Sequence, residues 1–150
     1  MKVKIQSLSS EQTMQIAEKI GQGIKFPCVI SLKGDLGAGK TTFTKGLAKG
    51  LNITEDVTSP TFTIMNQYNS KPFNLYHFDM YRLADKEEAL ALGFEEYFDL
   101  KLLKGVVVVE WAENVEGLLP IKITEIEIVK VDENKRDIII EYKGLIWYLQ

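Results

Sequence analysis

The sequence predicts a single three-layer α/β domain, in which helices cover a mixed, mostly parallel central sheet that ends in a C-terminal antiparallel β-hairpin. Residues 28–32 form a short apolar run followed by a glycine-rich loop and an amphipathic stretch, which is the order strand, loop, helix. Residues 106–109 are continuously apolar, as is typical of a strand buried on both faces of a parallel sheet. Residues 121–131 and 138–142 alternate apolar and polar positions, which predicts the hairpin.

Length and composition limit the possible architectures and partners. A chain of 150 residues, 45% of them hydrophobic, has the size of one domain with one core, so we expect residues 1–150 to form a single unit. The net charge of -3 provides no global attraction to nucleic acid or to an anionic membrane. Contact with RNA should therefore be local or depend on a partner.

The single cysteine and the N-terminal sequence indicate the compartment. Cys28 lies in an apolar run and can form neither an internal disulfide nor a cysteine metal cluster, so we expect a buried, inert thiol. The first residues lack the apolar stretch of a signal peptide, and no segment is long enough to cross a bilayer. We therefore expect a cytoplasmic protein with no membrane association.

The N-terminal elements are a strand and a helix. Residues 3–8 alternate like a short strand. Ser9 and Gln12 have the spacing of a capping box, which predicts that a helix begins there. Gly21 and Gly23 are expected to end that helix.

The middle of the chain predicts a second hairpin and a short helix. Residues 61–68 and 73–81 are expected to be strands joined by a polar turn. Asp85 and Glu88 have the spacing of a helix cap, and Gly93 is expected to interrupt the helix that follows.

The glycine-rich loop carries the strongest functional signal. Residues 34–41 match the pattern G-x-x-x-x-G-K-[ST] of a phosphate-binding loop, or P-loop. In such a loop the backbone N–H groups surround the phosphates, the lysine contacts the β- and γ-phosphates, and the hydroxyl binds Mg²⁺. A simple turn opening a helix would not require the Gly-Lys-Thr ending. We therefore predict a P-loop NTPase-like domain that binds ATP and Mg²⁺ at Gly37, Ala38, Gly39, Lys40, Thr41 and Thr42.

Two carboxylates are candidates for the rest of a magnesium and water site. Glu110 directly follows the apolar run 106–109, and Asp79 ends the strand predicted before it. Ligands of open α/β sheets bind at the carboxyl ends of the strands, where both residues are expected. His77 shares a strand face with Asp79, and either a structural or an acid–base role fits it. Trp111 is equally compatible with a core position and with a wall of the nucleotide site.

Several stretches give the chain a family resemblance. GDLGAGKTT (34–42), TSPTF (58–62), HFDMYRL (77–83), LGFEEYF (92–98) and the EW pair at 110–111 run in order across nearly the whole length. In these segments the chain resembles the bacterial TsaE (YjeE) family of tRNA threonylcarbamoyladenosine biosynthesis ATPases. The second and third segments are the most specific, because other P-loop proteins do not share them.

The resemblance implies a function and assigns residues to it. It implies a cytoplasmic ATPase, with weak activity of its own, that works with TsaD and TsaB homologues to form threonylcarbamoyladenosine at position 37 of tRNAs reading ANN codons; tRNA would be contacted through that complex. By position, Lys40 and Thr41 would hold phosphate and magnesium, Glu110 would be a metal ligand, and Asp79 would be catalytic or bridged to the metal by water. Trp111 matches a functionally important tryptophan, and the loop of Thr58, Ser59, Pro60 and Thr61 would act as a switch.

One position departs from the family pattern. Ala112 follows Trp111 where the family commonly has proline, which leaves the conformation of that loop open.

Two other functions share the P-loop. A small-molecule kinase generally needs several arginines in a lid, whereas Arg82 and Arg136 are the only arginines of this chain. A GTPase-like switch would explain Asn134-Lys-Arg-Asp137, which fits the guanine-reading pattern NKxD. That motif falls in the predicted hairpin turn rather than after a buried strand, so hydrolysis of ATP is the preferred prediction.

Overall fold

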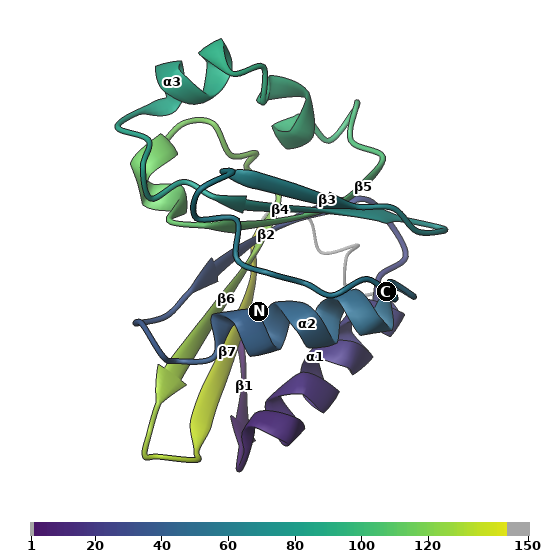
Figure 1. Ribbon diagram of the computed structural model, residues 1–150, viewed down its shortest axis with the longest axis vertical. Helices are drawn as coiled ribbons and strands as arrows, with labels where there is room; N and C mark the ends of the chain where they lie inside the picture. The colour runs from purple at the N-terminus through teal and green to yellow at the C-terminus, as the bar shows by residue number, and fades with distance from the viewer. Residues whose placement is uncertain (1, 144–150) are drawn as a thin grey trace.

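Residues 2–143 of the chain are described by a computed structural model (Figure 1). Seven strands form one sheet in the order β1-β7-β6-β2-β5-β4-β3. The strands are β1 (Lys2–Ser7), β2 (Cys28–Lys33), β3 (Met65–Tyr68), β4 (Asn74–Asp79), β5 (Gly105–Glu110), β6 (Ile123–Lys130) and β7 (Arg136–Lys143). The helices are α1 (Ser10–Gly23), α2 (Lys40–Gly50) and α3 (Lys86–Ala91), with two 3₁₀ turns, η1 (Glu95–Phe98) and η2 (Ala112–Val115). The predicted α/β class is confirmed.

The sheet is parallel at its centre and antiparallel at both sides. Strands β6, β2, β5 and β4 are neighbours and run parallel. β3 joins β4, and β7 joins β6, as antiparallel partners, so the predicted C-terminal hairpin is confirmed. The sequence had suggested that this hairpin forms the edge of the sheet, and that expectation is wrong. β1 pairs with β7 and satisfies the outer backbone groups of β7, so β1 is the edge strand.

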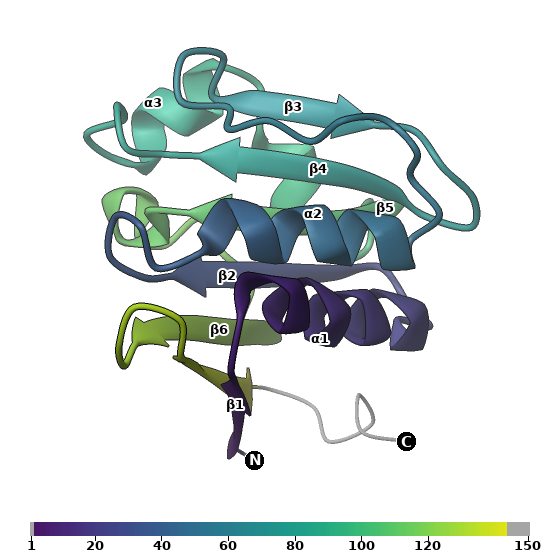
Figure 2. The same cartoon turned by 60° about the horizontal axis from the view of Figure 1, so that its bottom comes forward.

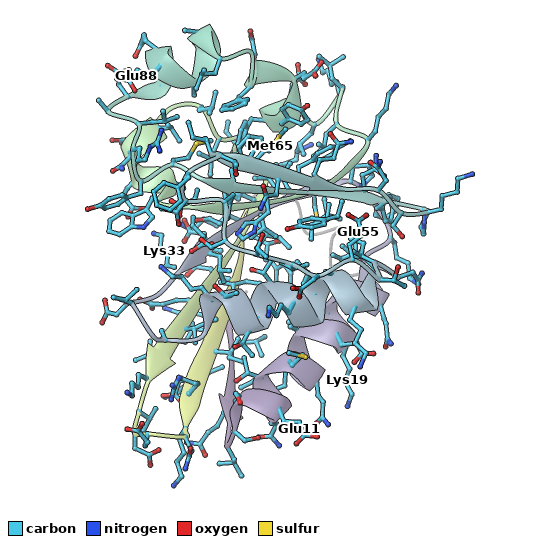
Figure 3. All side chains as sticks on the ribbon, viewed as in Figure 1. Glu11, Lys19, Lys33, Glu55, Met65 and Glu88 are labelled. Atoms are coloured by element: carbon cyan, nitrogen blue, oxygen red, sulfur yellow. The ribbon has the colours of Figure 1, made fainter. Side chains whose placement is uncertain are left out.

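Helices cover both faces of this sheet. Figures 1 and 2 show α1 and α2 side by side on one face, with α3 and the 3₁₀ turns over the other. The first face buries a core that includes Phe43 and Leu47 of α2, and the second buries Phe78 with Phe98. Charged side chains such as Glu11 and Glu88 project from the outer surfaces of these layers (Figure 3). The three-layer arrangement thus follows from two separate apolar cores.

Glycine controls the contact between α1 and α2. A Cβ atom on Gly46 would lie 2.3 Å from the carbonyl oxygen of Met14, and one on Gly21 would lie 2.5 Å from that of Leu47. The prediction that Gly21 and Gly23 end the first helix is confirmed, since α1 ends at Gly23 and the N–H of Ile24 donates to the oxygen of Gly21 at 3.3 Å. Gly21 also allows α2 to approach. This packing fixes where α2 starts, and therefore where the phosphate loop lies.

Two strands are shorter than predicted. β3 begins only at Met65, because residues 61–64 form a turn closed by a 2.7 Å hydrogen bond from the N–H of Ile64 to the oxygen of Pro60. β4 ends at Asp79, where the N–H of Tyr81 turns back to the Asp79 carboxylate at 3.0 Å. Both deviations place loop backbone beside the carboxyl ends of the central strands.

Candidate functional site: the phosphate loop and its carboxylates

The glycine loop between β2 and α2 has the backbone of an anion cradle. Gly37 and Gly39 adopt φ values of 81° and 110°, which side-chain-bearing residues rarely tolerate. The N–H of Ala38 closes a turn onto the oxygen of Asp35 at 2.9 Å. Gly39 is the N-cap of α2 and supplies no capping side chain, so the first N–H groups of the helix remain available to a ligand. A helix N-terminus of this kind attracts phosphate.

Glu110 connects this loop to the sheet. It ends β5, is 6% exposed, and places Oε1 at 3.5 Å from Nζ of Lys40. Its second oxygen, Oε2, lies 2.7 Å from Nε2 of His77, which is fully buried. Because an ionised carboxylate only accepts hydrogen bonds, a neutral imidazole must carry its proton on Nε2. The Nδ1 atom of His77 is buried and has no hydrogen-bond partner among residues 2–143.

Asp79 stands next to Glu110 on the neighbouring strand. The two residues are direct register partners at the carboxyl ends of β4 and β5, so their side chains share the α2 face of the sheet. Oδ1 of Asp79 accepts the N–H of Tyr81 at 3.0 Å, and Oδ2 accepts the hydroxyl of Thr61 at 3.4 Å. Thr61 in turn lies 2.8 Å from the hydroxyl of Ser59. The loop after Val57 is therefore tied to the same carboxylate.

Two aromatic rings border the site. Trp111 has a left-handed backbone (φ 59°) and is 40% exposed, with its ring centroid 5.9 Å from Nζ of Lys40. The ring of Tyr81 packs edge-on against it at 5.0 Å. Ala112 is buried and begins η2, and Asn114 closes that turn through a 3.1 Å hydrogen bond from its N–H to the oxygen of Trp111. Alanine in place of the usual proline is thus accommodated at the start of a 3₁₀ turn.

These groups surround one cavity of about 630 Å³. The predicted residues that line it are Gly37, Gly39, Lys40, Thr41, Thr42, Ser59, Thr61, Asp79, Glu110 and Trp111. Three predicted residues do not. Ala38, within the loop, and Pro60 are both buried. Thr58 lies further along its loop, where its N–H donates to the hydroxyl of Tyr68 at 3.2 Å.

Sequence patterns missed two contributors. Tyr81 lines the cavity just beyond the end of β4; its period-two relation to Asp79 and its place in the segment HFDMYRL were the local signals, but no site role was assigned to it. Arg136 donates to the back of the phosphate loop from a residue 98 positions away, for which the sequence offers no local signal. It also lines a smaller cavity of about 190 Å³ with Ser10, Thr13 and Asn134.

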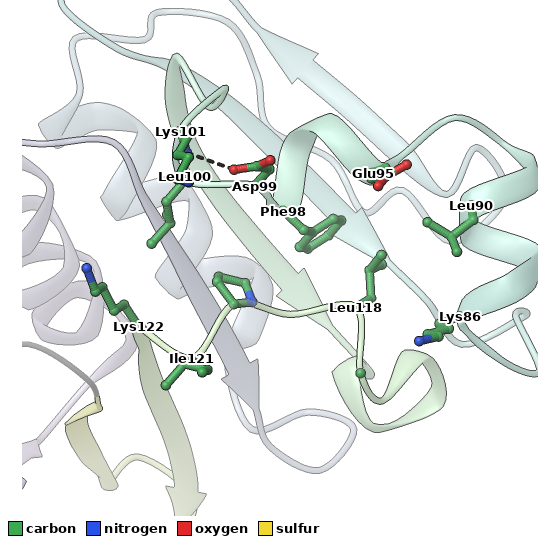
Figure 4. A pocket seen from close by; sticks show the side chains of 12 residues that line it. Lys86, Leu90, Glu95, Phe98, Asp99, Leu100, Lys101, Leu118, Ile121 and Lys122 are labelled. Atoms are coloured by element: carbon green, nitrogen blue, oxygen red, sulfur yellow. Dashed lines mark hydrogen bonds between the residues drawn. The ribbon is translucent and has the colours of Figure 1, made fainter.

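A separate hollow of about 520 Å³ lies on the α3 side of the molecule (Figure 4). Lys86, Phe98 and Ile121 are among its lining residues, and none of the predicted site residues lines it. In the described part of the chain, no group of three or more histidine, cysteine or acidic side chains is arranged to hold a metal ion. None of the helices between residues 2 and 143 is both long and apolar enough to cross a membrane.

Comparison with known proteins agrees with this architecture. The family model "Threonylcarbamoyl adenosine biosynthesis protein TsaE" matches residues 7–138. The tRNA threonylcarbamoyladenosine biosynthesis protein TsaE of Bacillus subtilis is 45% identical over 136 residues, covering 91% of this chain and 83% of its own length. The protein of the same name from Nostoc is 44% identical over 111 residues, covering 73% and 68%.

A solved structure shares the fold. The crystal structure of Bacillus subtilis YdiB superimposes with a TM-score of 0.81 at 40% identity and covers 96% of this chain and 87% of that one. The family resemblance and the fold class predicted from the sequence are thereby confirmed. The chain belongs to the TsaE family of threonylcarbamoyladenosine biosynthesis proteins.

Proposed function

We propose that this chain is a magnesium-dependent ATPase that acts in the formation of threonylcarbamoyladenosine on tRNA. The observation that carries the proposal is the convergence of Lys40, Thr41, Asp79 and Glu110 on one cavity at the start of α2. A lysine and a hydroxyl on a glycine loop, facing two carboxylates at strand ends, are the parts that phosphoryl transfer from a nucleotide requires.

The donor atoms around the loop fit magnesium. Thr41 offers a hydroxyl and Glu110 a carboxylate, and hard oxygen donors of this kind suit Mg²⁺. Magnesium in nucleotide sites usually keeps several waters and takes few protein ligands. The bound ion would neutralise charge on the β- and γ-phosphates.

Lys40 has to change partners when nucleotide binds. In the chain alone its ammonium group pairs with Glu110 at 3.5 Å. Phosphate oxygens would draw the lysine away and leave Oε1 of Glu110 free to face the metal. The same residue pair therefore serves the free and the nucleotide-bound states.

Asp79 is the candidate for orienting the attacking water. It is 7% exposed and lines the cavity, and Tyr81 and Thr61 fix its carboxylate through two hydrogen bonds. A carboxylate held in this way accepts a hydrogen bond from water in a defined direction. Trp111 would cover Lys40 and limit the access of bulk water.

The position of the NKxD pattern does not support a guanine-reading site. Asn134 and Arg136 line the smaller cavity behind the loop. Asp137, the last residue of the NKxD pattern, instead pairs with Lys4 at 3.3 Å and does not line that cavity. The guanine-reading part of the motif is therefore turned away.

Exposed apolar side chains near the phosphate cavity suggest where partner proteins bind. Leu36, Phe62 and Tyr81 are 103%, 85% and 60% exposed around the phosphate cavity, and such apolar side chains suit a protein contact. The acidic net charge of -3 does not attract RNA by itself. We therefore propose that TsaB and TsaD homologues bind here, and that tRNA is reached through them.

Reconstitution tests this function. The purified chain is combined with TsaB and TsaD homologues, tRNA, ATP and an activated threonylcarbamoyl donor, and modified adenosine and released phosphate are both measured. We expect modification to require the chain and to be lost in Lys40→Ala. Turnover that ignores these proteins but rises with a small hydroxyl substrate would instead indicate a kinase.

A further inference from the structure

Arg136 fastens the β6–β7 hairpin to the back of the phosphate loop. Its Nε donates to the carbonyl oxygen of Ala38 at 2.8 Å, and its Nη2 donates to that of Gly37 at 3.4 Å. Arg136 is the first residue of β7, so the contact joins the C-terminal hairpin to the loop between β2 and α2.

The same guanidinium also holds the hairpin tip. Nη1 of Arg136 donates to the carbonyl oxygens of Asp132, Lys135 and Glu133 at 2.9, 3.0 and 3.3 Å. The Asp132 carboxylate accepts the N–H groups of Lys135 and Asn134, and these bonds hold the pKa of Asp132 below its usual range. The tip is thus a shaped turn with a defined place for the arginine.

A phosphate loop creates the need for such a residue. When successive peptide N–H groups turn toward a phosphate, the carbonyl groups of neighbouring peptides turn away from it. Those carbonyls need donors of their own, since unpaired polar groups in a packed region cost free energy. The planar fork of an arginine can serve two adjacent carbonyls at once, which a lysine ammonium cannot do with the same geometry.

Charge adds to this effect. None of the ion pairs found among residues 2–143 includes Arg136, so its partners there are carbonyl dipoles. Its positive charge therefore lies directly behind Gly37 and Ala38 with no carboxylate in ion-pair contact, although Asp132 of the same turn interacts with it electrostatically. Positive charge at that position favours an anion on the other side of the loop.

We propose that Arg136 is a positioning residue for nucleotide binding: it presets the phosphate loop by holding its outward carbonyls and adds positive charge behind the phosphates. This inference rests on the proposed binding of ATP at the loop. It assigns a role to the hairpin tip, and it explains why one of only two arginines in the chain stands at the start of β7.

The test compares Arg136→Lys and Arg136→Met with the wild-type chain. Arg136→Lys keeps the charge and loses the fork, whereas Arg136→Met loses both. Lys135→Met is the matched control, because it removes a positive charge from the neighbouring exposed position of the same turn. Affinities for ATP and for inorganic pyrophosphate are measured by calorimetry with Mg²⁺ and without partner proteins, and thermal unfolding is recorded with and without ATP.

We expect Arg136→Lys to weaken ATP and pyrophosphate binding about ten- to a hundredfold, as the loss of hydrogen bonds from a charged donor predicts. Arg136→Met should weaken it further, and Lys135→Met should change it little. The unfolding temperature of Arg136→Lys without nucleotide should stay near that of the wild type, while the increase caused by ATP becomes smaller.

A purely structural arginine gives a different result. Both Arg136 variants would then bind ATP and pyrophosphate as tightly as the wild type at temperatures where they are folded, and only the unfolding temperature without nucleotide would fall. That outcome would overturn the inference and leave the proposed function intact. A wild-type chain that binds neither ligand would instead overturn the proposed function.

If Arg136→Met does not fold, amide hydrogen exchange in Arg136→Lys tests whether Arg136 presets the phosphate loop. Exchange at residues 35–39 should be faster than in the wild type, with no change in β5. Unchanged exchange at the loop would contradict the proposal.

Discussion

The Nε2 atom of His77 lies 2.7 Å from Oε2 of Glu110, and the two side chains are 0% and 8% exposed. This hydrogen bond fixes one carboxylate oxygen on the sheet and directs the other toward Lys40. The histidine that the sequence left between a structural and an acid–base role is therefore in direct contact with the proposed metal ligand.

Replacing His77 tests this contact. His77→Leu leaves a buried carboxylate oxygen without its donor, so we expect the free energy of unfolding to fall by about 1–3 kcal/mol. His77→Gln keeps an N–H donor and should lose less. Urea denaturation of the two variants measures the difference, and equal stability would show that the hydrogen bond contributes nothing.

Replacing Glu110 tests the metal ligand. Glu110→Gln keeps the volume of the side chain but removes the charge, so ATP binding in the presence of Mg²⁺ should weaken about tenfold or more, as expected when a charged partner is lost. Binding without Mg²⁺ should change less. Glu113→Gln, at an exposed position three residues further along the chain, is the control. A Mg²⁺ dependence identical to that of the wild type would exclude Glu110 as a ligand.

Asp79→Asn separates chemistry from binding. The amide lacks the negative charge and has one acceptor oxygen in place of two, so it should hold the attacking water less firmly; hydrolysis should fall about a hundredfold or more while ATP affinity changes little. Asp56→Asn, at a side chain that is 87% exposed, serves as the control. Single-turnover phosphate release and equilibrium titration are compared, and an affinity loss as large as the rate loss would assign Asp79 to binding.

The helix contact makes an independent prediction about stability. Gly46→Ala puts a methyl group 2.3 Å from the oxygen of Met14, so it should destabilise the fold by about 2 kcal/mol or more, although alanine favours helices. At Gly23 no atom lies within 4 Å of such a methyl group. Gly23→Ala should therefore stabilise the chain by about 0.5–1 kcal/mol. Thermal unfolding checks both signs, and equal effects would contradict the packing described for α1 and α2.

Cys28 predicts a dependence on pH. Burial raises the pKa of its thiol from 9.0 to about 12, so the folded chain keeps a proton that the unfolded chain releases above pH 9. The protonated Cys28 thiol therefore makes its full contribution to the free energy of unfolding below about pH 9, and this contribution is lost as the pH rises toward 12. We expect a thiol reagent at pH 8 to react only when the chain unfolds, and rapid labelling of the folded protein would contradict this burial.

The sequence predicted the elements that depend on local patterns. The alternation of residues 121–131 and the apolar run 106–109 gave the hairpin and the central strand, because side-chain periodicity reports burial directly. The predicted strand start at Thr61 was wrong since Ile64, a β-branched residue with a φ of 68°, lies in a turn that no local propensity favours. Gly21 and Gly23 marked the end of α1 correctly, whereas the contact of Gly21 with α2 depends on another helix and left no local signal.

The residues of the candidate site also fall into those that local patterns predicted and those that they did not. The loop pattern and the carboxylates at strand ends identified Lys40, Asp79 and Glu110, which the structure brings to one cavity. The bonds of His77 and Arg136 join residues 33 and 98 positions apart in sequence. Such contacts depend on strand order and on the path of the hairpin, which periodicity does not encode.

The most direct test of the central claim is a titration of the purified chain with ATP and with GTP in the presence of Mg²⁺, repeated on Lys40→Ala. The account predicts that ATP binds more tightly than GTP and that the lysine variant loses this binding. Tighter binding of GTP, or ATP binding that does not depend on Lys40, would contradict it.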